Sequence, residues 1–174
     1  MTLDLTKYKE LAVAKDKENQ LFLVRVGKKM PKDLDKVTNA IHDKVAAKIN
    51  CMECANCCKS ISPILTDRDV DKIAKHLRIK AADLLKQHLE IDKEGDFVFR
   101  SQPCPFLQDD NACSIYEARP KACKEYPHTD QKRIHQVLKL TYFNTSICPI
   151  AFDVVEDLKK VYVDQVKQKP AHLR

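Results

Sequence analysis

The segment CMECANCC, residues 51–58, places four cysteines within eight positions in the pattern Cys-x2-Cys-x2-Cys-Cys. Two intervening residues allow a tight turn to direct two sulfur atoms at one point, and the overlapping repeats do this twice. Zinc holds thiolate sulfurs about 2.3 Å from the metal, and ferredoxin-type iron–sulfur sites use the same Cys-x2-Cys spacing. This segment therefore predicts a metal centre around which the rest of the chain is organised.

Cys57 and Cys58 are adjacent, so their side chains point about 100° apart on a helix and about 180° apart on a strand. Both sulfurs would fit one tetrahedral ion only with distortion. The pair indicates one of three arrangements: one thiol is not a ligand, the two thiols bind different ions, or the metal centre is larger than one ion.

Four further cysteines lie in irregular chain or at the ends of expected elements: Cys104, Cys113, Cys123 and Cys148. Cys148 precedes Pro149, so we expect its sulfur near a helix N-terminus, where a thiolate is favoured. A cysteine is often simply a small buried apolar residue, and this alternative stays open for each of the four. Disulfides and a catalytic thiol are further alternatives, although no feature singles out one cysteine as a nucleophile.

On the N-terminal side of the cluster the sequence predicts two helices. The first covers residues 4–26, and the second begins near Pro31, a residue suited to a first helical turn. Apolar residues of the second helix recur at three- and four-residue spacing, which forms one face of an amphipathic helix: Leu34, Val37, Ile41, Val45 and Ile49. This helix leads directly to Cys51.

On the C-terminal side of the cluster, Thr66 and Asp69 form a capping pattern at the start of a helix. A further helix is expected over residues 81–89. The β-prone segment 97–100 is expected to pair with residues 114–116 as a small hairpin.

These elements predict a mainly α fold: a single helical domain with an irregular cysteine-rich metal-binding centre and at most a small β-hairpin. We expect residues 1–49 to form N-terminal helices that pack on the core. Residues 50–150 form the cysteine-cluster domain, and residues 149–168 form a C-terminal helix of the same domain.

The composition excludes several classes of protein. Gly27 and Gly95 are the only glycines, whereas the loops that bind phosphates or dinucleotides need closely spaced glycines. The start of the chain has no apolar run of signal-peptide length, and no segment has the length and apolarity of a membrane span. We therefore expect a cytoplasmic protein without membrane association. In that compartment, clustered cysteines indicate metal ligands or catalytic groups rather than disulfides.

The formal net charge is +6 with all cysteines neutral. Four thiolates around a zinc ion or a dicationic four-iron cluster carry a net charge of about −2, so two such sites would lower +6 to about +2. The basic residues thus partly offset thiolate charge. Basic residues are not interleaved with aromatic ones, and finger-type Cys/His spacing is missing, which argues against nucleic-acid binding. His128 and His135 are weaker candidate ligands, because eight thiols are available.

The order of four motifs resembles the YkgJ-like family of bacterial cysteine-cluster proteins. The motifs are CMECANCC (51–58), ISPILTDRDVDKIAKHLRI (61–79), CPFL (104–107) and CSIYEARPKACKEYP (113–127). The resemblance covers roughly residues 50–150 and implies a zinc- or iron-chelating domain with all eight cysteines as candidate ligands. Family members often carry Gly after the second cysteine. Because this chain has Ala55 there, a left-handed turn is not expected at that residue, whereas Asn56 tolerates one.

Together, the residues and the resemblance predict a protein that holds an iron–sulfur cluster or zinc through cysteine thiolates. The overlapping spacing and the Cys57–Cys58 pair favour iron–sulfur. One alternative is a structural zinc module that mediates protein interactions. Another is a metal-dependent enzyme for redox chemistry or protein-lysine methyl transfer, since the family is also similar to flagellin lysine N-methylases. The sequence identifies no catalytic residue, and the partner would be an unidentified protein or small molecule. Arg119 is either a counter-charge for thiolates or a surface arginine at a helix start.

Overall fold

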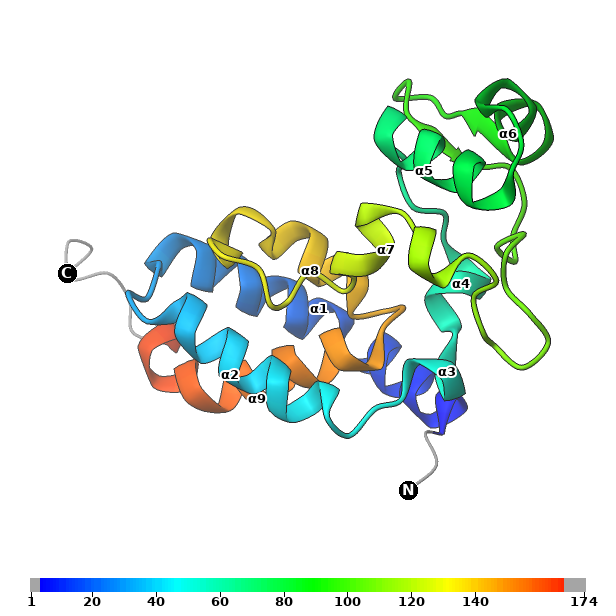
Figure 1. Cartoon of the computed structure of the whole chain (residues 1–174). Helices are drawn as coiled ribbons and strands as arrows, with labels where there is room; N and C mark the ends of the chain where they lie inside the picture. Colours follow the sequence, from blue (N-terminus) through cyan, green and yellow to red (C-terminus); the bar gives the residue numbers. More distant parts are fainter. Residues whose placement is uncertain (1–3, 168–174) are drawn as a thin grey trace. The chain divides into compact units, whose positions relative to one another are not determined.

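The computed structural model describes the backbone of residues 4–167 and the side chains of residues 4–163. These residues fall into two compact units (Figure 1). The first unit combines the chain up to Asn50 with the chain from Pro127 onward, and the second unit is Cys51–Tyr126. In the described residues the only sheet has two strands, so the predicted mainly α fold with a small hairpin is confirmed.

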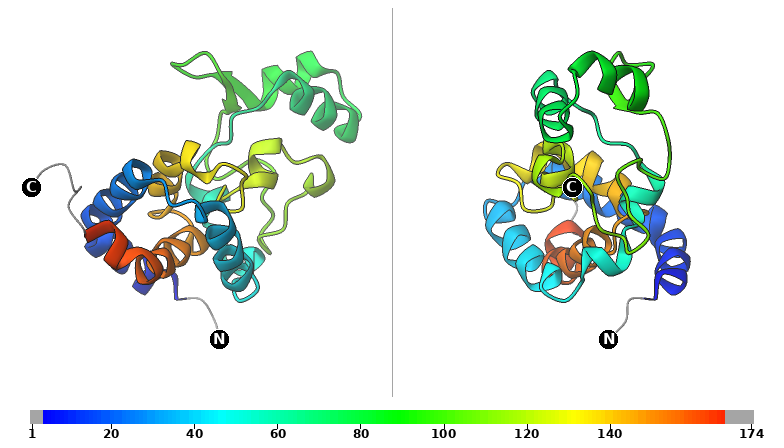
Figure 2. Two further views of the ribbon diagram at one scale, coloured as in Figure 1. Left: turned by 90° about the vertical axis from the view of Figure 1, so that its left-hand side faces the viewer. Right: turned by 45° about the vertical axis from the view of Figure 1, so that its right-hand side comes forward.

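The first unit is a helix bundle. Its elements are α1 (Leu5–Lys29), α2 (Leu34–Ala46), the 3-10 turn η2 (Ile134–Gln136), α8 (Leu138–Asn144) and α9 (Pro149–Lys167). Helix α9 packs against α1, α2 and α8, and both views in Figure 2 show it beside α1. The two predicted N-terminal helices are confirmed, and so is the helix that starts at Pro149.

Apolar residues of α9 hold this bundle together. Val154, Val155 and Leu158 are buried. Near the N-terminus of α1, the ring of Tyr8 packs edge to face against the ring of Phe152, with 5.7 Å between the ring centroids. Edge-to-face pairs of this kind add stability beyond the area that they bury.

Asn19 is an exception in this bundle. It lies in the middle of α1 and is fully buried. Neither Oδ1 nor Nδ2 of its side chain has a hydrogen-bond partner among the described residues. A buried amide without partners is destabilising, so this residue costs the bundle free energy.

The second unit consists of short helices and a hairpin. Its elements are α3 (Cys51–Cys54), α4 (Asn56–Ser60), α5 (Asp67–Leu77), α6 (Ala81–His88), β1 (Leu89–Ile91), β2 (Phe97–Phe99), the 3-10 turn η1 (Tyr116–Ala118) and α7 (Lys121–Glu125). Helices α5 and α6 pack together beside the hairpin (Figure 1). The apolar core between them includes Ile73, Leu84, Leu89 and Phe99.

The predicted capping pattern at α5 is confirmed. The backbone N–H of Thr66 donates to Oδ2 of Asp69 at 3.0 Å, and the N–H of Asp69 donates to Oγ1 of Thr66 at 3.2 Å. This reciprocal arrangement is a capping box.

The predicted pairing of the hairpin is wrong. Strand β2 pairs antiparallel with β1, with Leu89 opposite Phe99. The carboxylate of Asp92 accepts the N–H groups of Glu94 and Asp96, and Gly95 adopts a positive φ of 90°, so a tight turn joins the strands. This partner is nearer in the chain than residues 114–116, so less loop-closure entropy is lost. Because Leu89 begins β1, the helix predicted over 81–89 ends at His88.

The domain boundaries proposed from the sequence stay a prediction, and Gln168, where the last helix was expected to end, lies outside the described residues. No helix within residues 4–167 combines the length and the apolar character needed to cross a bilayer.

Candidate metal centre

Seven of the eight cysteines lie in the second unit. They are carried by short helices or by the ends of one loop: Cys51 and Cys54 in α3, Cys57 and Cys58 in α4, Cys104 and Cys113 at the loop ends, and Cys123 in α7. None of the eight cysteines, all of which are described, forms a disulfide. Cys104 and Cys113 pack against the core of the unit, which gives the loop a fixed base.

A left-handed residue separates the cysteines of α3 from those of α4. Ala55 has φ 47° and ψ 17°, and its N–H donates to the carbonyl of Cys51 at 2.8 Å. The N–H of Lys59 then donates to the carbonyl of Ala55 at 3.1 Å. The left-handed turn therefore occurs at Ala55 itself, contrary to the expectation that alanine would not adopt it. It folds the four clustered cysteines onto two short helices.

Ala55→Gly is expected to change the free energy of unfolding by less than about 1 kcal/mol. Relief of the left-handed strain gains about 1–2 kcal/mol. This gain offsets the backbone entropy of glycine, about 0.5–1 kcal/mol, and the lost burial of the methyl group of Ala55, about 0.8 kcal/mol. Urea unfolding followed by circular dichroism would measure the change. Ala40→Gly, in the exposed middle of α2, is the control and should destabilise by about 1 kcal/mol. Equal losses in both variants would contradict the strain at Ala55.

The two adjacent cysteines of α4 approach each other. Their Sγ atoms lie 4.0 Å apart, whereas two sulfurs on one tetrahedral zinc ion lie about 3.8 Å apart. This distance is compatible with one shared ion, contrary to the expectation that adjacent side chains diverge. The hydrogen bond with Cys57 lowers the pKa of Cys58 to about 7, although burial opposes this shift.

Backbone hydrogen bonds bring the loop to α4. The N–H of Cys104 donates to the carbonyl of Cys58 at 2.8 Å. Leu107 and Cys113 form an antiparallel bridge that closes the loop, and the N–H of Tyr116 donates to the carbonyl of Cys113 at 3.1 Å. These contacts tie cysteines 46 or more positions apart in the chain to the same part of the unit.

The thiols of this unit affect one another electrostatically. Burial, together with smaller effects of the charges of Cys58 and Cys113, raises the pKa of Cys104 to about 11. Burial and the charge of Cys58 also raise the pKa of Cys51, Cys113 and Cys123, and the charge of Cys54 adds to the effect at Cys51. Cys58 therefore lies within electrostatic reach of four other thiols, from three different segments of the chain.

Arg119 opposes these effects. Its positive charge lowers the pKa of Cys51, Cys113 and Cys123. Its guanidinium carbon lies 3.9 Å from the centroid of the Tyr116 ring, a cation–π contact that restrains the side chain. Of the two interpretations of Arg119, this arrangement favours the counter-charge for thiolates.

The thiols do not form a finished coordination site. Among the side chains of residues 4–163, no three of Cys, His, Asp or Glu converge closely enough to hold one metal ion. The donors nevertheless suit zinc or iron, both of which bind cysteine thiolates. Metal binding would therefore require rotation of side chains or movement of the short helices, together with loss of thiol protons.

Comparison with known proteins agrees with this donor set. Residues 50–148 match a family described as "CxxCxxCC: Putative zinc- or iron-chelating domain". The chain belongs to the CxxCxxCC family. The resemblance to the YkgJ-like proteins is thereby confirmed, and the match covers more than half of the chain and every cysteine.

One relative is an uncharacterized protein of Methanocaldococcus jannaschii, 32% identical over 96 residues. The aligned region is 53% of this chain and 51% of that protein, so the chain spans about half of the relative's length. No solved structure matches the chain.

Cys148 is the last residue of the CxxCxxCC match and lies in the first unit. It is buried, and its N–H donates to the carbonyl of Asn144 at 2.8 Å. Helix α9 begins at the next residue, as expected from Pro149. The role of Cys148 as a metal ligand stays a prediction.

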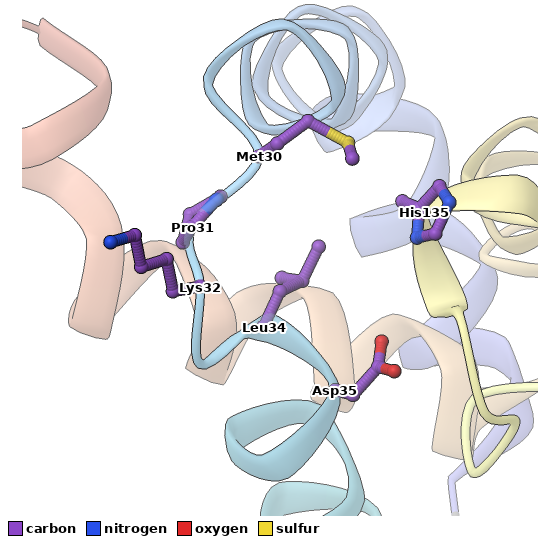
Figure 3. Close-up of a pocket in the computed structure, with 6 residues that line it drawn as sticks. All are labelled: Met30, Pro31, Lys32, Leu34, Asp35 and His135. Carbon is purple, nitrogen blue, oxygen red and sulfur yellow. The ribbon is translucent and has the colours of Figure 1, made fainter.

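A pocket in the first unit is lined by His135, one of the two histidines considered as candidate ligands (Figure 3). It has a volume of about 240 Å³ and is lined by Met30, Pro31, Lys32, Leu34, Asp35 and His135. The carboxylate of Asp35 accepts the backbone N–H groups of Arg133 and Ile134 at 2.8 and 2.9 Å, which satisfies it. With one imidazole and no thiol in its lining, this pocket is a poor match to a zinc or iron site.

Proposed function

We propose that the protein binds a metal centre of more than one metal ion through the thiolates of its second unit, and that this centre is an iron–sulfur cluster. The observation that carries the proposal is the placement of seven cysteines in the second unit. There the Sγ atoms of Cys57 and Cys58 lie 4.0 Å apart, and the N–H of Cys104 donates to the carbonyl of Cys58 at 2.8 Å. One zinc ion uses only four ligands, so the thiols exceed the needs of a single ion.

The spacing of the clustered cysteines supports iron–sulfur over zinc, since it matches ferredoxin-type runs. Such a cluster would supply one-electron redox chemistry, and Arg119 would offset part of its negative charge. Cys148 is proposed as an eighth ligand on the basis of the family match alone. A cytoplasmic location fits this proposal, because reduced thiols persist there.

A structural zinc site is the second candidate, and the short helices favour it. Helices α3, α4 and α7 have four or five residues each, whereas isolated helices of this length are unstable in water. A metal ion that joins them would stabilise the unit, as it does in small zinc domains. The surface of such a module would then be available to a protein partner.

Anaerobic purification would test both candidates. We expect a coloured protein that contains iron and acid-labile sulfide, with more than one metal ion per chain. The control is a variant in which Cys51, Cys54, Cys57 and Cys58 are all serine, which should contain neither. A colourless protein with zinc and no sulfide would refute the iron–sulfur cluster and support the structural zinc site. Metal contents equal to those of the control would refute metal binding itself.

A further inference from the structure

The carboxylate of Asp69 bonds to two separate parts of the second unit. Its Oδ2 accepts the backbone N–H and the hydroxyl of Thr66, which caps α5. Its Oδ1 accepts the backbone N–H of Lys121 at 2.9 Å, across 52 positions of the chain. Capping alone therefore explains only one of its two oxygens.

Asp69 is well suited to hold this contact. The residue is 7% exposed, and burial alone would raise the pKa of its carboxyl group. The hydrogen bonds from Thr66 and Lys121 outweigh burial, so the pKa of the carboxyl is lowered and the group is charged at neutral pH. Hydrogen bonds to a charged acceptor are roughly twice as strong as neutral ones.

Helix α7 has few other anchors. It begins at Lys121 and carries Cys123 two residues later, and none of its five residues is fully buried. Its N-cap residue, Pro120, makes no side-chain capping hydrogen bond. The ion pair between Lys121 and Glu125 spans 3.6 Å and is exposed, so it adds little.

We propose that Asp69 is a positioning residue of the metal centre, which holds the start of α7 so that Cys123 reaches the other thiols. The carboxylate acts on the ligand through the backbone of Lys121. This role rests on the proposed function, because Cys123 must be a ligand for its position to affect metal binding.

Lys121→Pro removes the donor of this bond and leaves the capping box intact. Pro120 has φ −53° and ψ 153°, an extended conformation that a following proline permits. Proline also suits the first position of a helix, so α7 can keep its backbone. Lys121→Ala is the matched control, because it removes the ion pair with Glu125 and keeps the N–H.

Competition for Zn²⁺ with a chromogenic chelator is the measurement. Lys121→Pro should bind Zn²⁺ about 10–100-fold more weakly than the wild type, the usual cost of losing support for a ligand. Lys121→Ala should bind as the wild type does. If the wild type binds Zn²⁺ no more tightly than Lys121→Pro does, the role of Asp69 is refuted, whereas the proposed function is not. Wild-type protein that binds neither zinc nor iron would refute the proposed function and this role with it.

A double-mutant cycle with Cys123→Ser separates positioning from general stability. If Asp69 acts through Cys123, then Lys121→Pro should have no further effect on Zn²⁺ affinity in the Cys123→Ser background. Additive effects would refute the proposal, because a merely structural role adds to the loss of the thiol.

A second pair of variants decides the question if Lys121→Pro does not fold. Asp69→Asn weakens the bond to Lys121, whereas Thr66→Ala removes only the capping hydroxyl. Amide hydrogen exchange in residues 121–125 should be faster in Asp69→Asn than in Thr66→Ala. Equal exchange in the two variants would refute the proposal.

Discussion

Cys58→Ser is expected to lower the affinity of the protein for Zn²⁺ by about two orders of magnitude. A four-ligand structural zinc site binds with about 10–16 kcal/mol, so one thiolate contributes about 3 kcal/mol, equivalent to roughly a hundredfold change in affinity. Cys58 is chosen because it interacts with four other thiols and its carbonyl accepts the N–H of Cys104. The serine keeps that carbonyl, so the variant tests the sulfur.

Chelator competition against the wild type would measure this loss. His76→Gln is the control, because His76 is an exposed imidazole on α5 and should not matter. Cys148→Ser tests the proposed eighth ligand: a comparable loss would support it, and unchanged affinity would refute it. Unchanged affinity in Cys58→Ser would contradict a metal centre built around this thiol.

Local signals in the sequence were sufficient for most elements of the fold. The Thr66–Asp69 capping box, the strand at Phe97–Phe99 and the helix that starts at Pro149 all depend on residues within a few positions of one another. The residue types at these positions predict the local backbone conformation. The four clustered cysteines of residues 51–58 could also be predicted as candidate ligands from their local spacing alone.

Contacts between distant residues could not be predicted in the same way. The pairing of β2 depended on a competition between two partners, and the bond from Lys121 to Asp69 crosses 52 positions. The approach of the Cys57 and Cys58 sulfurs depends on side-chain rotamers, which spacing does not specify. Ala55 adopts a strained conformation that its residue type disfavours. Such departures from local preference occur where the surrounding structure overrides it.

Asn19→Leu is expected to raise the free energy of unfolding by about 2 kcal/mol. Removing a buried amide that has no partners recovers about 1–3 kcal/mol, and burying the leucine side chain adds about 1.5–3 kcal/mol. Leucine branches like asparagine but is larger, so overpacking opposes this gain with a cost of about 1–3 kcal/mol. The net change is positive because Asn19 is fully buried and both amide atoms lack partners among the described residues.

Urea unfolding followed by far-UV circular dichroism would measure this change. Gln20→Leu is the matched control, since Gln20 is the exposed neighbour on the same helix. It introduces the same leucine side chain without the change in burial. Glutamine and leucine have similar helix propensity, so Gln20→Leu should leave the stability nearly unchanged. A buried water could also satisfy the amide. In that case Asn19→Leu would displace the water and lower the stability relative to Gln20→Leu, which would contradict the prediction.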